Sequence, residues 1–365
     1  MSGEELRIEE EIRRARTLPG RFYTDPKVFE LCKERIFART WQWVGDVKDS
    51  QSPGSCRPAT LLPEFLGEEV LIVRDGAGEL RCLSNVCTHR GAIVCPKEAK
   101  AQALRCPYHG RRFALDGRFL SMPEFEGVEG FPSEKDHLAR IPLGLWRQFA
   151  FASLEPAFPF PDLVAEIEMR VGWLPLRDSV LDLGRSKDYE VQASWALYCD
   201  NYLEGFHVPF VHPKLAAGLD VSKYTTELFR YASVQVGEAK EGEPAFDLPR
   251  ASPDFGRRVA GYYFWLFPNT MLNFYPWGVS VNLVLPLAPD RTTVRFLTYV
   301  WDASKLESGA GSGLDRVEHE DEEVVESVQR GVRSRFYERG RYSPTQERGV
   351  HHFHRLIARF LGESP

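Results

Sequence analysis

Residues 87–110 read CTHRGAIVCPKEAKAQALRCPYHG, and this stretch decides the fold of the domain around it. Cys87 and His89 form a C-x-H pair. Cys106 and His109 form a C-x2-H pair, and a glycine follows each of the two pairs. Glycine reaches backbone conformations that other residues avoid, so it suits the tight turn that each pair requires. The pattern predicts two short loops that offer two thiolates and two imidazoles to one metal centre.

Two thiolates on one iron and two imidazoles on the other are the ligand set of a Rieske [2Fe-2S] cluster. Neutral imidazoles make such a cluster less negative, and its potential lies at roughly −150 to +300 mV, against about −400 mV for four-cysteine ferredoxins. Zinc also accepts two cysteines and two histidines. The two different spacings, each with a trailing glycine, favour the iron–sulfur cluster over zinc or unrelated core residues.

A second candidate site lies in residues 199–212, which read CDNYLEGFHVPFVH. Glu204 and His207 are three residues apart, so we expect them to share one helix face. We expect Pro209 to end this helix, so that His212 turns back towards His207. Two histidines and a carboxylate are the ligands of a mononuclear Fe(II) with open positions for O2 and substrate. Such a histidine pair alone is more often structural, but electrons from a cluster need a destination, and this pair provides one.

The carboxylate ligand has to come from another part of the chain. An acidic segment from about residue 317 offers Glu318, Glu320, Asp321, Glu322, Glu323 and Glu326. A run of charges is usually a solvated helix face, so the pattern alone does not choose among them.

The periodicity of apolar residues divides the chain into three parts. Residues 1–40 form a helical part, with one or two helices around the break at Pro19 and Gly20. Residues 41–155 form an all-β domain, with strands at 69–74, 80–84 and 149–154. Residues 156–365 begin with a proline-rich linker and mix both patterns. Helices are expected there at 162–170, 194–207, about 317–335 and about 344–361, and strands at 260–267, 271–275, 279–287 and 292–301. This layout predicts an α+β fold, in which the all-β domain is inserted into a domain of helices on an antiparallel sheet.

The composition limits the partners of the protein. The formal net charge of −6 argues against nucleic acid or an anionic membrane. The most apolar stretch, 262–287, is interrupted by prolines and asparagines and does not read as a membrane span. The N-terminus shows no secretory signal, so we expect a cytoplasmic protein. The seven cysteines do not suggest a disulfide scaffold, and Cys82 and Cys95 are interpreted as unreactive thiols.

With both motifs in place, the chain resembles the α subunits of Rieske non-haem iron oxygenases, the ring-hydroxylating type. Within that family it most closely resembles the quaternary-ammonium oxygenases, which include choline monooxygenase. The likeness covers residues 41–360. It includes segment 199–212, YTTELF at 224–229, FPN at 267–269, PWG at 276–278, NLVLPL at 282–287, EDEEVVESVQRGVRS at 320–334, GRYS at 340–343 and HHFH at 351–354.

The resemblance implies a helix-grip-like catalytic domain and completes the iron site. The family's carboxylate ligand lies eight residues before the position of Gln329, which gives Asp321. The family's bridging carboxylate corresponds to Glu204, and it would accept a hydrogen bond from a cluster histidine of the neighbouring subunit in a homotrimer. Asn201 is interpreted as a residue that tunes the ligands. HHFH is interpreted as structural.

The resemblance also implies the reaction, an O2-dependent hydroxylation or N-dealkylation of a small quaternary-ammonium compound. No dinucleotide or flavin motif appears in the sequence, so electrons from NAD(P)H would arrive through a separate flavin- or ferredoxin-type reductase. Aromatic residues could form a cage around the ammonium group through cation–π attraction. The candidates are Phe206, Trp265, Phe267, Tyr275 and Trp277. The same residues could flank an aromatic ring or belong to the core, and strand alternation allows only about half of them to face a cavity.

Three rival functions stay open at this point. The first is an aromatic-ring-hydroxylating dioxygenase on the same scaffold. The second is a Rieske electron carrier, which the second motif and the length of chain after the cluster domain disfavour. The third is a binding module that has lost its iron.

Overall fold

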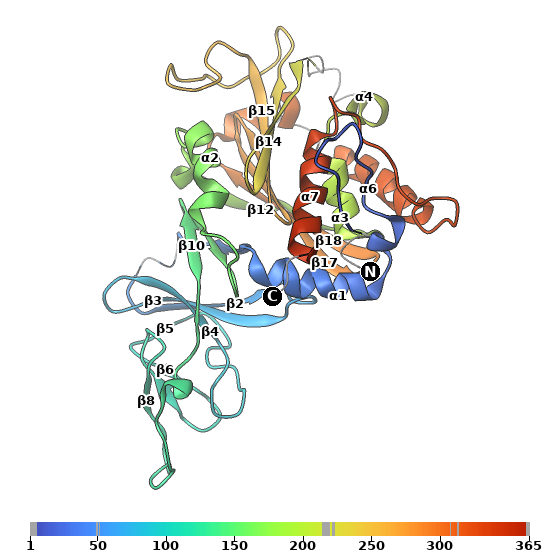
Figure 1. The fold of residues 1–365 in the computed structure, drawn as a ribbon. Coiled ribbons are helices and arrows are strands. Elements are labelled where there is room, and N and C mark those ends of the chain that lie inside the picture. The colour runs from blue at the N-terminus through green and yellow to red at the C-terminus, as the bar shows by residue number, and fades with distance from the viewer. Residues whose placement is uncertain are drawn as a thin grey trace. The chain divides into compact units, whose positions relative to one another are not determined.

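The structure is a computed structural model, and it describes residues 6–48, 50, 52–213, 220, 223–306, 308–311 and 314–362. The chain forms two compact units (Figure 1). One unit is Ala38–Ala157, and the other combines Met1–Phe37 with Phe158–Pro365. The first unit is therefore inserted into the second in chain order. The first is built of strands and the second mixes helices with an antiparallel sheet, so the predicted α+β class is confirmed.

The inserted unit contains three antiparallel sheets. They have the strand orders β5-β2-β3-β4-β9, β1-β11-β10 and β6-β7-β8. The strands are β1 (Gln42–Asp46), β2 (Ser55–Leu61), β3 (Glu68–Arg74), β4 (Leu80–Ser84), β5 (Ala99–Lys100), β6 (Leu104–Arg105), β7 (Arg112–Phe113), β8 (Phe119–Ser121), β9 (Arg140–Ile141), β10 (Leu143–Trp146) and β11 (Phe149–Ala152). Strand β3 lies between β2 and β4, so its run Val70–Val73 is buried on both faces. The strands predicted at 69–74, 80–84 and 149–154 are confirmed within two residues.

The larger unit is organised around a seven-stranded antiparallel sheet with the order β12-β18-β17-β16-β15-β14-β13. Its strands are β12 (Val180–Val191), β13 (Thr225–Leu228), β14 (Ala232–Glu238), β15 (Val259–Leu266), β16 (Thr270–Tyr275), β17 (Gly278–Ala288) and β18 (Arg291–Val300). The four strands predicted from residue 260 onward are confirmed as β15 to β18, whereas β12, β13 and β14 were not predicted.

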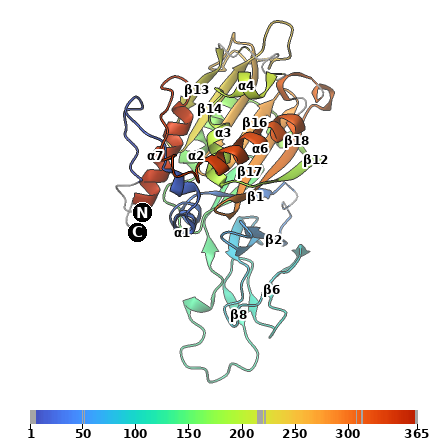
Figure 2. The same cartoon turned by 90° about the vertical axis from the view of Figure 1, so that its right-hand side faces the viewer.

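Helices α3, α6 and α7 lie on one face of this sheet (Figure 2). The helices of the unit are α1 (Pro26–Arg35), α2 (Pro161–Val171), α3 (Trp195–Tyr202), α4 (Val208–Val211), α6 (Leu314–Gly331) and α7 (Arg348–Gly362). Among the described residues, no helix is long and apolar enough to span a bilayer. Helix α7 is strongly amphipathic, and it buries Phe353 and Phe360. These rings contact Trp265 and Phe267 of the β15 end, at centroid distances of 5.1 and 5.0 Å.

Glycine at position 349 lets α7 come close to the chain that follows α3. A Cβ atom at Gly349 would lie 2.3 Å from the carbonyl oxygen of Leu203, closer than real contacts allow. This approach fixes where the segment after Leu203 begins, and that segment carries Glu204 and both histidines of the second motif.

Several predicted boundaries are wrong. Helix α3 ends at Tyr202 instead of 207, so Glu204 and His207 do not lie on one helix. Pro209 lies in the first turn of α4, and it does not end a helix. Proline has no backbone N–H, but in the first turn of a helix that group would have no partner within the helix. Helix α6 covers Leu314–Gly331 instead of 317–335, and α7 begins at Arg348 instead of 344. The described residues 6–18 contain no helix before the break at Pro19.

Candidate functional site

The two cluster loops have the same backbone design. The amide of Gly91 donates to the carbonyl of Cys87 at 2.9 Å, and the amide of Gly110 donates to that of Cys106 at 3.1 Å. Both glycines adopt positive φ angles, +71° and +72°, which a side chain would strain. The second loop joins β6 to β7, and an isolated bridge between Val86 and Ile93 closes the first. Each loop is therefore the tip of a hairpin-like turn.

The side chains of these loops fit a [2Fe-2S] cluster. Cys87 and Cys106 are buried, and the rings of His89 and His109 lie 4.8 Å apart. The Nδ1 atoms of both histidines are buried without a hydrogen-bond partner. A buried polar atom without a partner is costly, and a bond to iron would remove that cost. Burial also lowers the pKa of His89, which favours the neutral ring that a metal ligand requires.

Asp136 ties the two loops together. Its carbonyl oxygen accepts hydrogen bonds from Thr88 Oγ1 at 2.9 Å and from Arg111 Nη2 at 3.2 Å. Its carboxylate accepts a second bond from the same Arg111 nitrogen at 2.6 Å. The Arg111 side chain is 2% exposed, and its guanidinium lies over the rings of Phe119 and Phe131. All seven cysteines are free, so this ion pair links the loops without a disulfide.

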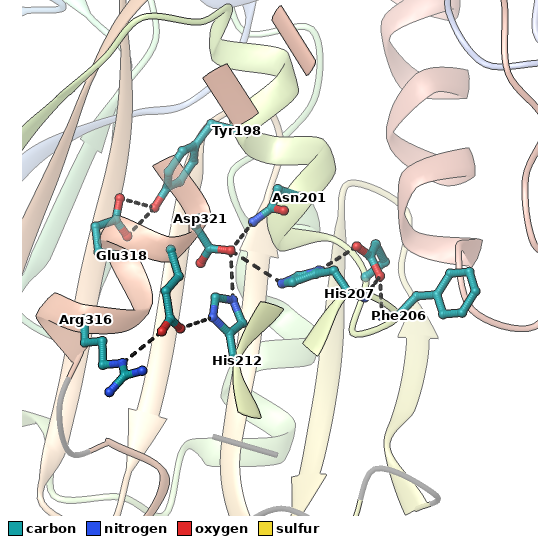
Figure 3. Close-up of polar contacts among 10 residues, drawn as sticks. Tyr198, Asn201, Phe206, His207, His212, Arg316, Glu318 and Asp321 are labelled. Carbon is teal, nitrogen blue, oxygen red and sulfur yellow. Dashed lines mark hydrogen bonds and ion pairs between the residues drawn. The ribbon is translucent and has the colours of Figure 1, made fainter. Parts of the chain in front are cut away.

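The second motif and helix α6 form a compact metal-ligand group. One ligand atom from each of His207, His212 and Asp321 lies within 4.8 Å of the others. Asp321 Oδ1 lies 2.9 Å from His212 Nε2 and 3.5 Å from His207 Nε2 (Figure 3). His207 follows α3, His212 follows α4, and Asp321 lies in α6. This donor set suits Fe(II) and leaves positions free for other ligands.

Each of these side chains is oriented by a neighbour (Figure 3). His207 Nδ1 pairs with Glu204 Oε1 at 2.6 Å, and His212 Nδ1 pairs with Glu320 Oε2 at 2.8 Å. Asn201 Nδ2 donates to Asp321 Oδ1 at 2.6 Å. The carboxylates leave Nε2 of both rings directed towards Asp321, which fixes the ring orientation before a metal binds. The role of Glu320 was missed, because the sequence shows it only as one acid among six.

A cavity opens beside this group. Its lining includes five tyrosines, four amide side chains and four apolar side chains. The tyrosines are Tyr198, Tyr202, Tyr224, Tyr263 and Tyr275, and the amides are Asn201, Gln235, Asn273 and Asn282. His207, His212 and Asp321 also line the cavity, so a small molecule bound in it would lie next to a metal held by these residues.

Of the five predicted pocket residues, only Tyr275 lines the cavity. Trp265 and Phe267 are buried under α7, which covers that end of the sheet. Trp277 stacks behind Tyr275 at 5.2 Å, and Phe206 is 48% exposed. Tyr263 lies two residues before Trp265 on the same face of the strand. The alternation of side chains along a strand identifies this face, but it does not show which end of the strand lies at the open cavity.

His351 and His354 of the HHFH segment have partners outside the candidate metal site. His354 Nε2 pairs with Asp200 at 2.8 Å, and its Nδ1 pairs with the hydroxyl of Tyr342 at 2.6 Å. His351 Nε2 contacts the carbonyl oxygen of Glu9 at 2.8 Å. These contacts join α7 to α3 and to the N-terminal segment, which is a structural role.

Comparisons with known proteins match both parts of the chain. The family profile described as "Ring hydroxylating alpha subunit (catalytic domain)" matches residues 180–363, and the profile "Rieske [2Fe-2S] domain" matches residues 40–132. The chain is 32% identical to the chloroplastic choline monooxygenase of Arabidopsis thaliana, over 95% of this chain and 83% of the relative. It is 31% identical to the carnitine monooxygenase oxygenase subunit of Escherichia coli (strain K12), over 94% of this chain and 93% of the relative.

Solved structures show the same relationship. The quaternary ammonium Rieske monooxygenase CntA, in complex with an inhibitor, has a TM-score of 0.78 and 26% identity, with 99% of this chain and 98% of CntA covered. Naphthalene 1,2-dioxygenase from Rhodococcus sp. has a TM-score of 0.72 at 20% identity, with 96% and 95% covered, which shows the shared fold alone.

Replacing Asp136 tests the link between the cluster loops. Asp136→Asn should destabilise the inserted unit by roughly 3 kcal/mol, because it leaves the buried Arg111 guanidinium without its counter-charge. Urea titration followed by the visible absorbance of the cluster would measure this. Asp116→Asn is the matched control, since Asp116 pairs with the exposed Arg118, and it should cost less than about 1 kcal/mol. Equal midpoints for the two variants would contradict the proposed link.

Proposed function

Because the chain belongs to the Rieske ring-hydroxylating oxygenase family, we propose that it oxidises a small quaternary-ammonium compound. As a member it is an oxidoreductase, the oxygenase component of a system with a [2Fe-2S] cluster, a mononuclear iron and electrons from a reductase. The catalytic domain at residues 180–363 rules out a simple electron carrier. The observation that supports the substrate class is the group of tyrosines around the cavity.

Three of these tyrosines form a continuous aromatic wall. Tyr224 and Tyr263 are stacked with centroids 6.3 Å apart, and Tyr263 meets Tyr275 edge to face at 5.9 Å. An ammonium group held against aromatic faces gains about 2 kcal/mol when the site excludes water. None of the described residues that line the cavity is lysine or arginine, so no fixed positive charge opposes such a cation. The relatives named above act on choline and carnitine, which carry the same trimethylammonium group.

The residues around the cavity have distinct tasks in this reaction. His207, His212 and Asp321 would hold the iron, which supplies O2 activation when it is bound. Glu204 and Glu320 keep the imidazoles oriented, and the tyrosine wall would present one C–H bond beside the ammonium nitrogen. Oxygen insertion there gives an alcohol on the carbon next to nitrogen, which separates into an aldehyde and an amine. Insertion at the alcohol carbon of choline gives an aldehyde hydrate instead.

A substrate screen tests this function. With a surrogate NADH-dependent reductase, we expect choline, carnitine or glycine betaine to stimulate O2 uptake and aldehyde formation, whereas simple arenes should not. Tyr263→Leu should raise KM for the ammonium substrate by about tenfold or more through loss of the aromatic face, while Tyr263→Phe keeps the ring and should change it little. Dihydroxylation of an arene, with no response to ammonium compounds, would instead identify a ring dioxygenase.

We also propose a cytoplasmic homotrimer in which Glu204 faces a cluster histidine of the neighbouring subunit. Buried free cysteines suit a reducing compartment. Phe206 and Phe210 lie close to Glu204 and are 48% and 79% exposed, and Tyr108 beside His109 is 60% exposed. Exposed aromatic groups at both ends of the proposed electron path support a protein interface there. Inter-subunit electron transfer is described for CntA.

Light scattering tests the assembly. The wild-type protein should have three times the mass of one chain, and Phe210→Glu should lower that mass because a charge would be buried in the interface. Phe336→Glu is the control, since Phe336 is 93% exposed and belongs to a different surface segment. A monomeric wild type, or a Phe210→Glu variant that stays trimeric, would contradict the proposal.

A further inference from the structure

We propose that Glu318 is the specificity-determining residue of the cavity, acting as the buried counter-charge of a cationic substrate, and that Gln235 accepts a hydrogen bond from a hydroxyl group on that substrate. The inference rests on the proposed function and narrows it to hydroxyalkyl ammonium compounds. Neither residue is needed to hold the iron, so their contribution can be separated from metal binding.

Glu318 lies one helical turn before Asp321 on α6 and lines the cavity. The residue is 4% exposed, and both carboxylate oxygens accept from the hydroxyl of Tyr198, at 2.8 and 2.7 Å (Figure 3). Among the described residues, no lysine, arginine or histidine pairs with it. A carboxylate removed from water without a cation is costly, and that cost falls when a cation enters the cavity.

Without a ligand, the surroundings of Glu318 favour the uncharged form of its carboxyl group. Burial raises the pKa of its carboxyl, and the nearby Asp321 and Glu322 add to the rise, while the hydrogen bond from Tyr198 opposes it. A positive ligand would act in the opposite direction, because an adjacent opposite charge favours the ionised carboxylate. A neutral ligand of the same shape would gain no electrostatic stabilisation from the Glu318 carboxylate.

Gln235 provides a second recognition element. Its amide nitrogen donates to the carbonyl oxygen of Tyr202 at 2.6 Å, which fixes the orientation of the amide. Its Oε1 atom is buried and has no hydrogen-bond partner, although the residue lines the cavity. This atom can only accept, so it matches a hydroxyl donor and not a carboxylate. A carboxylate-bearing zwitterion would also bring a negative charge next to the carboxyl groups that line the cavity, which disfavours its binding.

Binding measurements on the anaerobic, unreduced holoenzyme test the charge role. The probes are choline and its neutral isostere 3,3-dimethyl-1-butanol, compared by titration calorimetry. Wild type should bind choline more tightly than the isostere, and Glu318→Gln should lower that ratio of affinities about tenfold, to the part that the tyrosine wall supplies, while leaving the isostere affinity within about threefold. Glu323→Gln is the control, because Glu323 is exposed on the same helix and should leave both affinities unchanged.

A second pair of probes tests Gln235. Wild type should prefer choline to ethyltrimethylammonium, which lacks the hydroxyl, and Gln235→Leu should remove that preference. The wild type should also bind choline more tightly than glycine betaine, and a Gln235→Leu variant that keeps the preference for choline over ethyltrimethylammonium would contradict the role of Gln235. A Glu318→Gln variant that keeps the wild-type ratio of choline affinity to isostere affinity would overturn the inference and leave the proposed function intact. A wild type that binds none of the ammonium compounds would overturn the proposed function itself.

Discussion

One carboxylate oxygen, Oδ1 of Asp321, brings together side chains from three separate segments of the larger unit. It lies within 3.5 Å of His207 Nε2, His212 Nε2 and Asn201 Nδ2. Helix α6 therefore has to lie against α3 and the turn that follows α3, and the sheet has to support all of them. The cavity wall and the inward position of Glu318 follow from this arrangement, and the close approach of α7 at Gly349 fixes where the turn after α3 begins.

Both candidate centres use carboxylates outside the candidate ligand sets to position the candidate metal-binding side chains. Glu204 and Glu320 orient the two imidazoles of the mononuclear site. In the inserted unit Asp136 links the segments that carry the cluster ligands, through Thr88 and the buried Arg111. Side chains fixed in this way lose little conformational freedom when the metal binds, so the folded chain is prepared for its cofactors.

The sequence predicts the parts of this structure that depend on short-range spacing. Cys87, His89, Cys106 and His109 lie in loops whose glycines and turns are local, and the long strands β15 to β18 show a clear apolar pattern. The end of α3 is different: Glu204 and His207 contact each other through a turn after Tyr202, and no periodicity marks that change. Asp321 could be selected from the acidic run only through family resemblance. Glu318 belongs to the same run, and its burial depends on tertiary packing that the charge pattern conceals.

We propose that one chain holds two different iron centres, with Asp321 as a ligand of the second. Measuring iron and acid-labile sulfide per chain, together with the electron paramagnetic resonance signal of the reduced cluster, tests it directly. The wild type should contain three irons and two sulfides per chain, and Asp321→Ala should contain two irons with an unchanged cluster signal. Three irons retained in Asp321→Ala, or only two in a fully reconstituted wild type, would contradict it.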